Sequence, residues 1–397
     1  MVTVGEATEI ILNHLFTPGT QVVDVVESAG RVLAESVAAD RDFPPFNRVT
    51  MDGIAISFQT WSRGRRTFRI EGIQAAGENP KTLADPENCL EVMTGAVLPS
   101  GCDAVIRYED VEISDVNAFV KTDNVVQWQS IHAQGIDAKK DHPILVPGQR
   151  LAPSEIALLA SVGKSKVHVF TLPKVAVIST GDELVGIDQI PAPWQIRRSN
   201  SYALQSAVRE TGADATCFHL EDDRSMMMKR LPEIMRDFDV LILSGGVSKG
   251  KFDFVPQVLD AAGIEKLFHE VSQRPGKPFW FGRSASGKVA FALPGNPVST
   301  FMCFYRYVRP WILKSVGAPT HDSYAILGKD FSFAPPLTCF LQVSVRNERG
   351  KIVAYPHPGG GSGDFANLRD VDGFLELPPE KSAFEAGQVF PYLSFRH

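Results

Sequence analysis

Glycine and hydroxyl residues gather in three short turns in the second half of the chain, and such turns are suited to binding an anion. The turns are Ser179-Thr180-Gly181-Asp182-Glu183, Ser244-Gly245-Gly246-Val247-Ser248 and Pro294-Gly295-Asn296-Pro297. Glycine lets backbone N–H groups approach an anion closely, and the start of a following helix adds a favourable dipole. One such turn alone favours a plain connection between a strand and a helix. Three in succession predict a cradle for phosphate or pyrophosphate.

Carboxylates accompany these turns. Asp182 and Glu183 belong to the first turn, Asp222 and Asp223 follow another apolar segment, and Asp253 comes soon after the Ser-Gly-Gly turn. Acids beside a phosphate cradle repel the ligand unless a hard cation intervenes, and Mg²⁺ binds through one or two carboxylates plus substrate phosphates. The alternative for Asp182 and Asp222 is capping of a helix N-terminus. The cluster as a whole favours a magnesium site.

Basic residues balance the acids. Arg274-Pro275-Gly276-Lys277-Pro278 carries two cations on a rigid turn, Lys249 and Lys251 flank Gly250, and Arg197 and Arg198 precede Ser199-Asn200. A charge pair is most often a solvated surface feature, but the nearness of the phosphate turns favours ligand contact for Arg274 and Lys277.

A second set of polar residues lies next to glycines in the N-terminal part, in Thr50-Met51-Asp52-Gly53 and Met93-Thr94-Gly95-Ala96. Each segment is weak evidence by itself, because Asp-Gly is chiefly a turn signal. The sequence contains no P-loop and no His-Glu-x-x-His zinc motif.

Apolar strands alternate with helices where the three turns occur. Strands are expected over 175–179, 216–220, 240–243 and 289–293, and helices over 200–210, 224–236, 254–262 and 298–313. This alternation predicts a parallel sheet covered by helices on both faces. The carboxyl ends of its strands share one edge, where ligands bind in such sheets.

The remaining segments have other patterns. Residues 6–15 read as a short amphipathic helix, 22–37 contain a second helix start, and 153–162 return to helix. Short strands broken by turns are expected over 68–126, and the pattern after residue 319 suggests a small β barrel or sandwich.

The bulk composition excludes several classes of function. The 397 residues suggest two or three domains. The formal net charge of −6 argues against general affinity for nucleic acid or an acidic membrane surface. Five dispersed cysteines without a Cys-x-x-Cys pair indicate neither a disulfide framework nor a zinc site. Neither a signal peptide nor a long apolar run is visible, so a cytoplasmic location is expected.

Six segments, in the same order along the chain, together resemble the MoeA family, whose relatives include the E domain of gephyrin. The resemblance covers nearly the whole chain. Its specific parts are Thr50-Met51-Asp52-Gly53, Met93-Thr94-Gly95-Ala96 with Leu98-Pro99-Ser100-Gly101, Ser179 to Leu184, Ser244 to Ser248, Arg274 to Pro278, and Leu293 to Ser299.

The resemblance implies a multidomain α/β architecture and an elongated homodimer. A linker and dimerisation domain would comprise 1–46 and 139–170, a β-rich inserted domain 47–138, a MogA-like molybdopterin-binding α/β domain 171–317, and a small β barrel 318–397. The α/β domain of one subunit would face the N-terminal part of the other.

The resemblance also implies a reaction. Molybdopterin molybdenumtransferases of this family take adenylylated molybdopterin and molybdate, release AMP and form molybdenum cofactor, with Mg²⁺ taking part. A transient contact with a molybdopterin adenylyltransferase would supply the substrate. The metal would lie on Glu183, Asp222 and Asp253, and Asp52, Thr94 and Asp137 would form the partner-subunit wall of the catalytic site. The pterin phosphates would be held by Thr180, Gly181, Asn200, Ser244, Gly245, Gly246, Ser248, Arg274, Lys277, Pro294, Gly295 and Asn296.

The chain departs from the family pattern around the basic turn. Arg274 stands where the family usually has lysine, and arginine offers a planar fork where lysine is a point charge. His269-Glu270-Val271 stands where relatives often carry another lysine. We expect Lys249 or Lys251 to replace that cation. In the C-terminal region Ser362 is a candidate site residue.

Two other functions compete with this interpretation. A pterin adenylyltransferase of the MogA type, or a CinA-like amidohydrolase, uses a similar α/β domain, but residues 1–170 and the C-terminal barrel are additional to the MogA type. A non-catalytic scaffold of the gephyrin kind is the second alternative, against which the retained acidic cluster argues.

Overall fold

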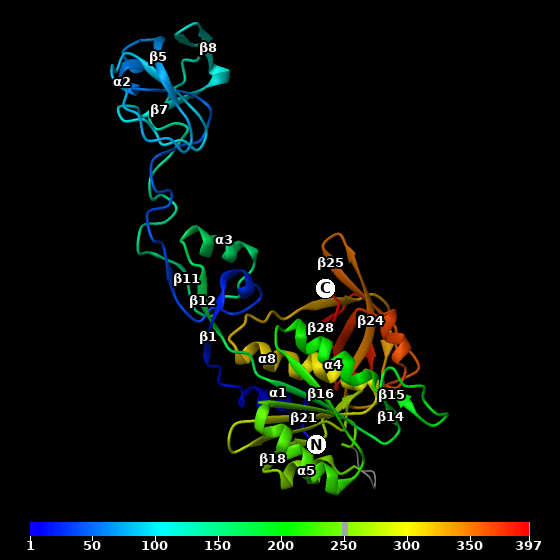
Figure 1. Ribbon diagram of the computed structural model, residues 1–397. Coiled ribbons are helices and arrows are strands. Elements are labelled where there is room, and N and C mark those ends of the chain that lie inside the picture. Colours follow the sequence, from blue (N-terminus) through cyan, green and yellow to red (C-terminus); the bar gives the residue numbers. More distant parts are fainter. Residues whose placement is uncertain (248–252, 397) are drawn as a thin grey trace.

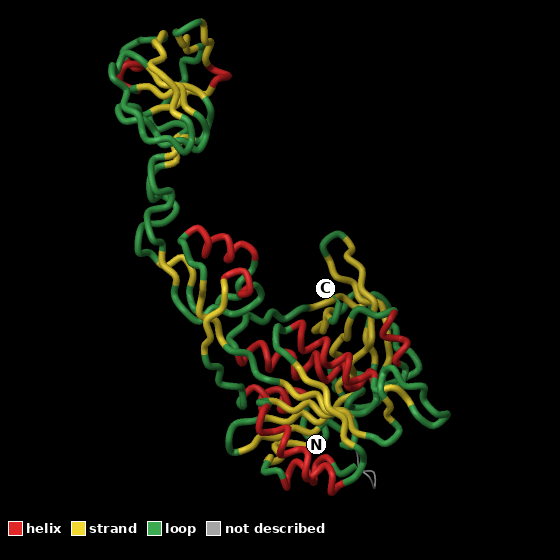
Figure 2. The backbone as a smooth tube through the Cα atoms, viewed as in Figure 1, coloured by secondary structure: helices red, strands yellow, loops and turns green. Residues whose placement is uncertain are grey.

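The computed structural model describes residues 1–247 and 253–396 and shows an elongated molecule (Figure 1). A small distal lobe, residues 48–132, stands apart from the main body and is joined to it by a narrow connector in which two segments of the chain run together. The main body holds the central α/β sheet and the C-terminal barrel. Figure 2 shows helices in red on both sides of the yellow strands there, and few helices in the distal lobe.

The distal lobe is built on one six-stranded sheet. Its strands are β4 (Gly53–Ile56), β5 (Thr67–Gln74), β6 (Cys89–Val92), β7 (Ala104–Arg107), β8 (Val111–Ser114) and β9 (Asn117–Val120), in the order β7-β4-β6-β5-β9-β8. One short helix, α2 (Phe58–Ser62), packs on it, and apolar clusters cover both faces. The expectation of short strands over 68–126 is confirmed.

The connector pairs segments that are far apart in sequence. Strand β1 (Thr20–Asp24) runs antiparallel to β12 (Lys166–Phe170), and β2 (Val37–Ala38) pairs with β11 (Pro143–Leu145). Helix α3 (Pro153–Ser161) packs on this region, close to its expected bounds. The helix start expected within 22–37 is wrong: residues 20–24 form a strand, followed by a single 3-10 turn (Val25–Ser28), because the partner strand lies about 145 residues away and leaves no local signal.

The N-terminal helix α1 (Val4–Leu12) begins two residues before its expected start. Thr3 caps it: the Glu6 backbone N–H donates to Thr3 Oγ1 at 3.2 Å, and the Thr3 N–H donates to Glu6 Oε2 at 2.7 Å. This reciprocal capping box fixes the start of the helix. Val4, Ala7 and Ile11 then bury one face against the α/β core.

The central sheet has the strand order β16-β13-β17-β21-β20-β18. The four predicted strands are confirmed as β13 (Val175–Thr180), β16 (Ala215–Leu220), β17 (Val240–Ser244) and β21 (Val289–Leu293), all parallel. The sheet is not wholly parallel, however. Strands β20 (Trp280–Ser284) and β18 (Ile264–His269) extend it, with β20 antiparallel to both β21 and β18. Strands β18 and β20 were not predicted from the sequence, because apolar and polar residues alternate there over too few positions to distinguish a strand from the surrounding turns.

Helices cover both faces of this sheet, as expected. They are α4 (Ser199–Glu210), α5 (Arg224–Asp237), α6 (Val255–Ala261), and a long helical segment made of α7 (Pro297–Cys303), the π-helical turn η3 (Phe304–Val308) and α8 (Arg309–Ser315). Two apolar clusters, one on each face, fill the space between helices and sheet.

The C-terminal region is a small closed barrel. Strands β22 (Tyr324–Leu327), β24 (Thr338–Glu348), β25 (Lys351–Pro356), β26 (Gly373–Leu377) and β28 (Val389–Ser394) pair in a ring, because β24 contacts both β25 and β26. The short strand β19 (Gln273–Arg274) of the α/β domain runs parallel to β24. The barrel is therefore joined to the basic turn that starts at Arg274.

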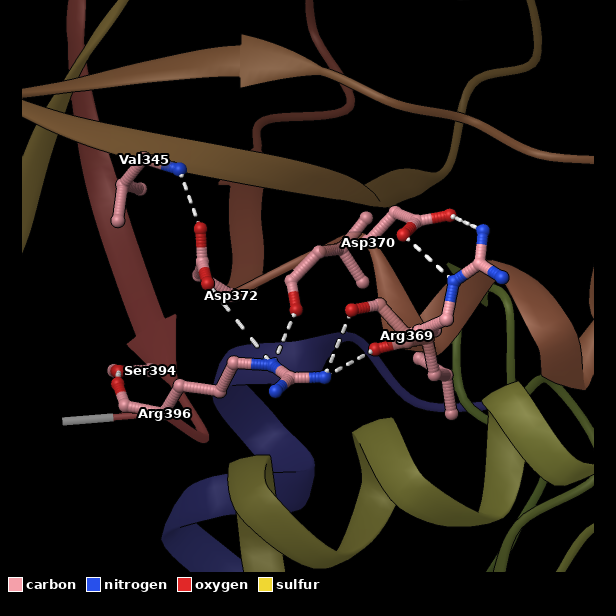
Figure 3. A network of polar contacts seen from close by, with 8 residues as sticks. Val345, Arg369, Asp370, Asp372, Ser394 and Arg396 are labelled. Atoms are coloured by element: carbon pink, nitrogen blue, oxygen red, sulfur yellow. Dashed lines mark hydrogen bonds and ion pairs between the residues drawn. The ribbon is translucent and has the colours of Figure 1, made fainter.

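Polar contacts at the C-terminus fix the segment that precedes β26 (Figure 3). Arg396 donates from Nη2 to the carbonyls of Leu368 and Arg369 at 2.9 and 3.0 Å, and from Nε to that of Val371 at 2.9 Å. The Asp372 carboxylate accepts from the Val345 N–H at 2.8 Å. The 3-10 helix η4 (Phe365–Arg369) and the glycine-rich loop before it are thus held against the barrel.

Candidate functional site

The three predicted turns lie side by side at one edge of the central sheet. Ser179 is in register with Ser244, and Ser244 with Leu293, so the turns after β13, β17 and β21 are neighbours. Asn200, in the first turn of α4, ties two of them together: its Nδ2 donates to Ser244 Oγ at 3.0 Å and to the Gly295 carbonyl at 2.8 Å. The Ser244 hydroxyl, the Asn200 amide and the glycine backbone of two turns therefore converge at this edge.

The first two turns approach each other as closely as glycine allows. A Cβ on Gly245 would lie 2.9 Å from the Thr180 carbonyl oxygen, and one on Gly246 would lie 3.0 Å from Thr180 Oγ1. Both glycines have positive φ, +103° and +66°. Thr180 Oγ1 is buried and has no hydrogen-bond partner among the described residues. Ser248, Lys249 and Lys251, the other residues expected here, lie outside the described residues.

The acidic residues gather on the same edge, beside the first turn. The pKa of Asp222 is raised above its ordinary value, first by burial and then by the negative charges of Asp182, Glu183 and Asp253. Four carboxylates thus act on one another, and their repulsion favours a bound cation.

Helix capping, the alternative role for Asp182 and Asp222, belongs instead to Asp223. Asp223 caps α5, accepting from the Met226 N–H at 2.9 Å, whereas Asp182 Oδ1 accepts from the backbone N–H of Asp222 at 2.9 Å. Asp222 therefore does not cap α5, and its carboxylate lies within the electrostatic influence of the other acids. Within the described ranges, no three His, Cys, Asp or Glu side chains are arranged to hold a metal by themselves.

A cavity of about 650 Å³ opens next to this edge, between the α/β domain and the barrel. Arg274, Lys277, Pro294 and Asn296 line it. The side chains of Arg274 and Lys277 are exposed, and in the described part of the chain neither makes a hydrogen bond or ion pair. Two exposed cations at a cavity wall can make charge-assisted hydrogen bonds to an oxyanion.

The barrel supplies the opposite wall of the cavity, which sequence reasoning largely missed. It contributes the loop 331–335 and the glycine-rich loop 358–362. Asn296 Nδ2 donates to Ser362 Oγ at 2.8 Å, and the Val298 N–H donates to the Ser362 carbonyl at 3.1 Å. Ser362, a candidate from the sequence, therefore lies at the cavity. The run of three glycines was the available signal for its loop.

Asp52, Thr94 and Asp137 lie far from this edge within the same chain. Asp52 and Thr94 are in the distal lobe, where the Thr94 N–H and Oγ1 donate to Asp52 Oδ1 at 2.6 and 2.8 Å and lower the pKa of Asp52. Asp137 is at the base of the lobe, 2.9 Å from His132 Nε2. The structure brings Asp52 and Thr94 together but keeps all three apart from the acidic cluster and the cavity.

The chain matches three family models along its length: the MoeA N-terminal region (domains I and II) over residues 2–163, a probable molybdopterin binding domain over 176–314, and the MoeA C-terminal region (domain IV) over 324–395. It is 42% identical to a molybdopterin molybdenumtransferase of Synechocystis sp. over the full length of both chains. A molybdopterin molybdenumtransferase of Bacillus subtilis is 31% identical, with 100% of this chain and 94% of the relative covered. A crystal structure of a molybdopterin biosynthesis MoeA protein from Pyrococcus horikoshii superposes with a TM-score of 0.86 at 27% identity, and both chains are fully covered.

Proposed function

Because the chain belongs to the MoeA family, we propose that it is a molybdopterin molybdenumtransferase acting in molybdenum cofactor biosynthesis. Its substrates are molybdate and adenylylated molybdopterin, and AMP is released. The observation that carries this proposal is the position of two exposed cations, Arg274 and Lys277, beside the edge of the sheet where the three turns lie side by side. The same edge carries four interacting carboxylates.

The site must bring two anions together, and its residues divide this task. The turns at 180–181, 244–246 and 294–296 offer N–H and hydroxyl groups to the pterin phosphate, and Asn200 holds two of these turns together. Arg274 and Lys277 offset the charge of molybdate at the cavity wall. The two dithiolene sulfurs are strong soft ligands for the metal, and when they bind, one oxo group of molybdate leaves as water with the two thiol protons. The protein therefore needs to position the reactants and neutralise their charge.

We place Mg²⁺ on Glu183, Asp222 and Asp253. The raised pKa of Asp222 fits this assignment, because a divalent cation would relieve the repulsion among the neighbouring carboxylates. Mg²⁺ usually binds through one or two carboxylates and substrate phosphates, and the phosphate turns adjoin these acids. When bound, the ion would neutralise the charge that develops on the departing adenylate.

We propose that Asp52, Thr94 and Asp137 complete the site of a second copy of the chain in a cytoplasmic homodimer. The distal lobe stands away from its own α/β edge at the end of the connector (Figure 1). Residues so placed can act at this cavity only when it belongs to another subunit. A transient contact with the adenylyltransferase that supplies the substrate is part of the proposal.

The match to relatives named as transferases, over 100% and 94% of their lengths, favours this function over the adenylyltransferase and scaffold alternatives. The test is conversion of adenylylated molybdopterin plus molybdate into a form that reactivates an apo-molybdoenzyme. Lys277→Ala should raise the KM for molybdate by at least about tenfold, the loss expected when a charge-assisted contact is removed. Lys351→Ala, which removes an exposed lysine from the barrel hairpin, is the matched control. Equal activity of the two variants would exclude the proposed anion site.

Subunit sharing has its own experiment. Asp52→Ala and Lys277→Ala should each be inactive or impaired alone, and mixing them under subunit exchange should restore activity, because a mixed dimer contains one intact shared site. The absence of any recovery, with exchange verified by mass, would place Asp52 in the site of its own chain or outside any site.

A further inference from the structure

The basic turn that carries Arg274 and Lys277 rests on two buried polar side chains. Gln273 is fully buried and Tyr307 is 2% exposed. Tyr307 Oη donates to Gln273 Oε1 at 2.5 Å, and Gln273 Nε2 donates to the Gly276 carbonyl at 2.9 Å. This chain of hydrogen bonds runs from the helical segment η3 to the middle of the turn.

The turn packs closely on this support. Gly276 has φ +90°, and a Cβ there would lie 2.8 Å from Cys303 Sγ and 2.9 Å from Gln273 Nε2. Gln273 is at the same time a residue of β19, in register with Thr338 of the barrel. Gln273 therefore connects the turn and the helix through its side-chain amide, and the edge of the barrel through its backbone.

Tyr307 is held from its own side. Its ring packs on Phe279 with ring centroids 5.0 Å apart, and the preceding residue, Arg306, forms an ion pair with Glu376 of the barrel at 2.7 Å. Arg306 and Tyr307 both lie in the π-helical turn, a local widening of the helix that is frequent at functional sites. Burial raises the pKa of Tyr307 well above its ordinary value, so the hydroxyl remains a donor.

A buried amide is costly unless its donor and acceptor are both satisfied, and here both are. We propose that Gln273 and Tyr307 are positioning residues, which fix the Gly276 carbonyl so that Arg274 and Lys277 face the cavity in the geometry that binds the oxyanion. The inference rests on the function proposed above. Its physical basis is preorganisation: cations already held in place lose less conformational entropy when the anion binds.

The experiment compares molybdate affinity with folding stability. Gln273→Met keeps the volume but removes both hydrogen bonds, and Gln273→Glu can accept from Tyr307 but, as a carboxylate, cannot donate to Gly276. Both should weaken molybdate binding, measured by calorimetry with molybdate alone, by about tenfold. In turnover they should raise the KM for molybdate and leave kcat at saturating molybdate within about twofold. Tyr307→Phe keeps the bond to Gly276 and should have a smaller effect, about threefold.

The matched control is Gln205→Met in α4, which removes an amide bond to the Ala215 carbonyl, 2.8 Å long, in the same domain but outside the cavity. It should lower the unfolding temperature and leave molybdate affinity unchanged. Loss of stability without loss of affinity in the Gln273 and Tyr307 variants would overturn the inference. If Gln273→Met does not fold, Tyr307→Phe decides by the same criterion. Unchanged affinity in Arg274→Ala and Lys277→Ala would instead refute the proposed anion site itself.

Discussion

Replacing Gly245 by alanine tests whether the turns at the sheet edge form one rigid unit. The new Cβ would lie 2.9 Å from the Thr180 carbonyl oxygen and 3.0 Å from Thr180 Oγ1. Neither atom can retreat easily, because Thr180 ends β13 in the middle of the sheet. The backbone at Gly245 also has φ +103°.

Two costs add in this variant. An L-residue in the left-handed region loses about 1–2 kcal/mol, and overpacking of a fixed site costs about 1–3 kcal/mol. Gly245→Ala should therefore reduce the free energy of unfolding by roughly 2–5 kcal/mol. The assay is urea-induced unfolding of the full chain, followed in the transition of the α/β domain.

Two other glycines of the same domain separate these costs. Gly263 has φ +81° with no atom within 4 Å of a Cβ, so Gly263→Ala should lose only the conformational part, about 1–2 kcal/mol. The Cβ of Gly295→Ala would meet its nearest atom at 3.5 Å, and φ there is not positive, so we expect little change. If Gly245→Ala is no more destabilising than Gly263→Ala, Thr180 is not fixed against the second turn and the argument for a rigid cradle is wrong.

Three further predictions concern charge. The folded-state pKa of Asp222 is raised above its ordinary value of 3.8. The stability that its protonated form contributes is therefore fully present below that value and is lost as the pH rises through the raised pKa. Asp222→Asn should remove this pH dependence, measured from unfolding temperatures between pH 3.5 and 7 without Mg²⁺. Lys288 donates from Nζ to the carbonyls of Met235, Arg236 and Phe238 at the end of α5. Lys288→Met should therefore reduce the free energy of unfolding, measured by urea titration, by about 2 kcal/mol. An unchanged free energy of unfolding would show that water replaces the ammonium without cost. Thr94→Val should raise the pKa of Asp52, because the substitution removes one of the two hydrogen bonds that lower this pKa. The pKa is measured by NMR titration of the Asp52 carboxyl carbon, and a titration curve identical to that of the wild type would contradict this cause.

Local pattern was enough for the elements that carry the phosphate turns. Strands β13, β17 and β21 are short, mainly apolar runs, and β16 is a shorter mixed run; each is followed by a polar or glycine-rich turn and then by a helix, and this order is visible in the sequence. Parallel strands joined by helices must end at one edge, so the sequence also predicted that Thr180, Ser244 and Pro294 would be neighbours. Chain connectivity and periodicity together determine this part.

Local pattern was misleading where pairing is long-range. Strand β1 looked like the start of a helix, because its partner β12 is about 145 residues away. Strands β18 and β20 escaped prediction, since their antiparallel pairing at the sheet edge has no periodicity of its own. Asp223 rather than Asp222 caps α5, because the helix begins at Arg224, and a difference of one residue in a helix start is not visible in the sequence pattern.

By itself, the sequence determined the order of the four parallel strands of the central sheet and of their helices, the turns at the edge of that sheet and the two cations on the turn 274–278. Only the tertiary structure decided that this turn faces the barrel across a cavity, at which Ser362 accepts a hydrogen bond from Asn296. It also decided that Gln273, hydrogen-bonded to Tyr307, supports the turn. The physical reason is that these contacts join residues 34 to 66 positions apart, and their packing leaves no periodic trace along the chain.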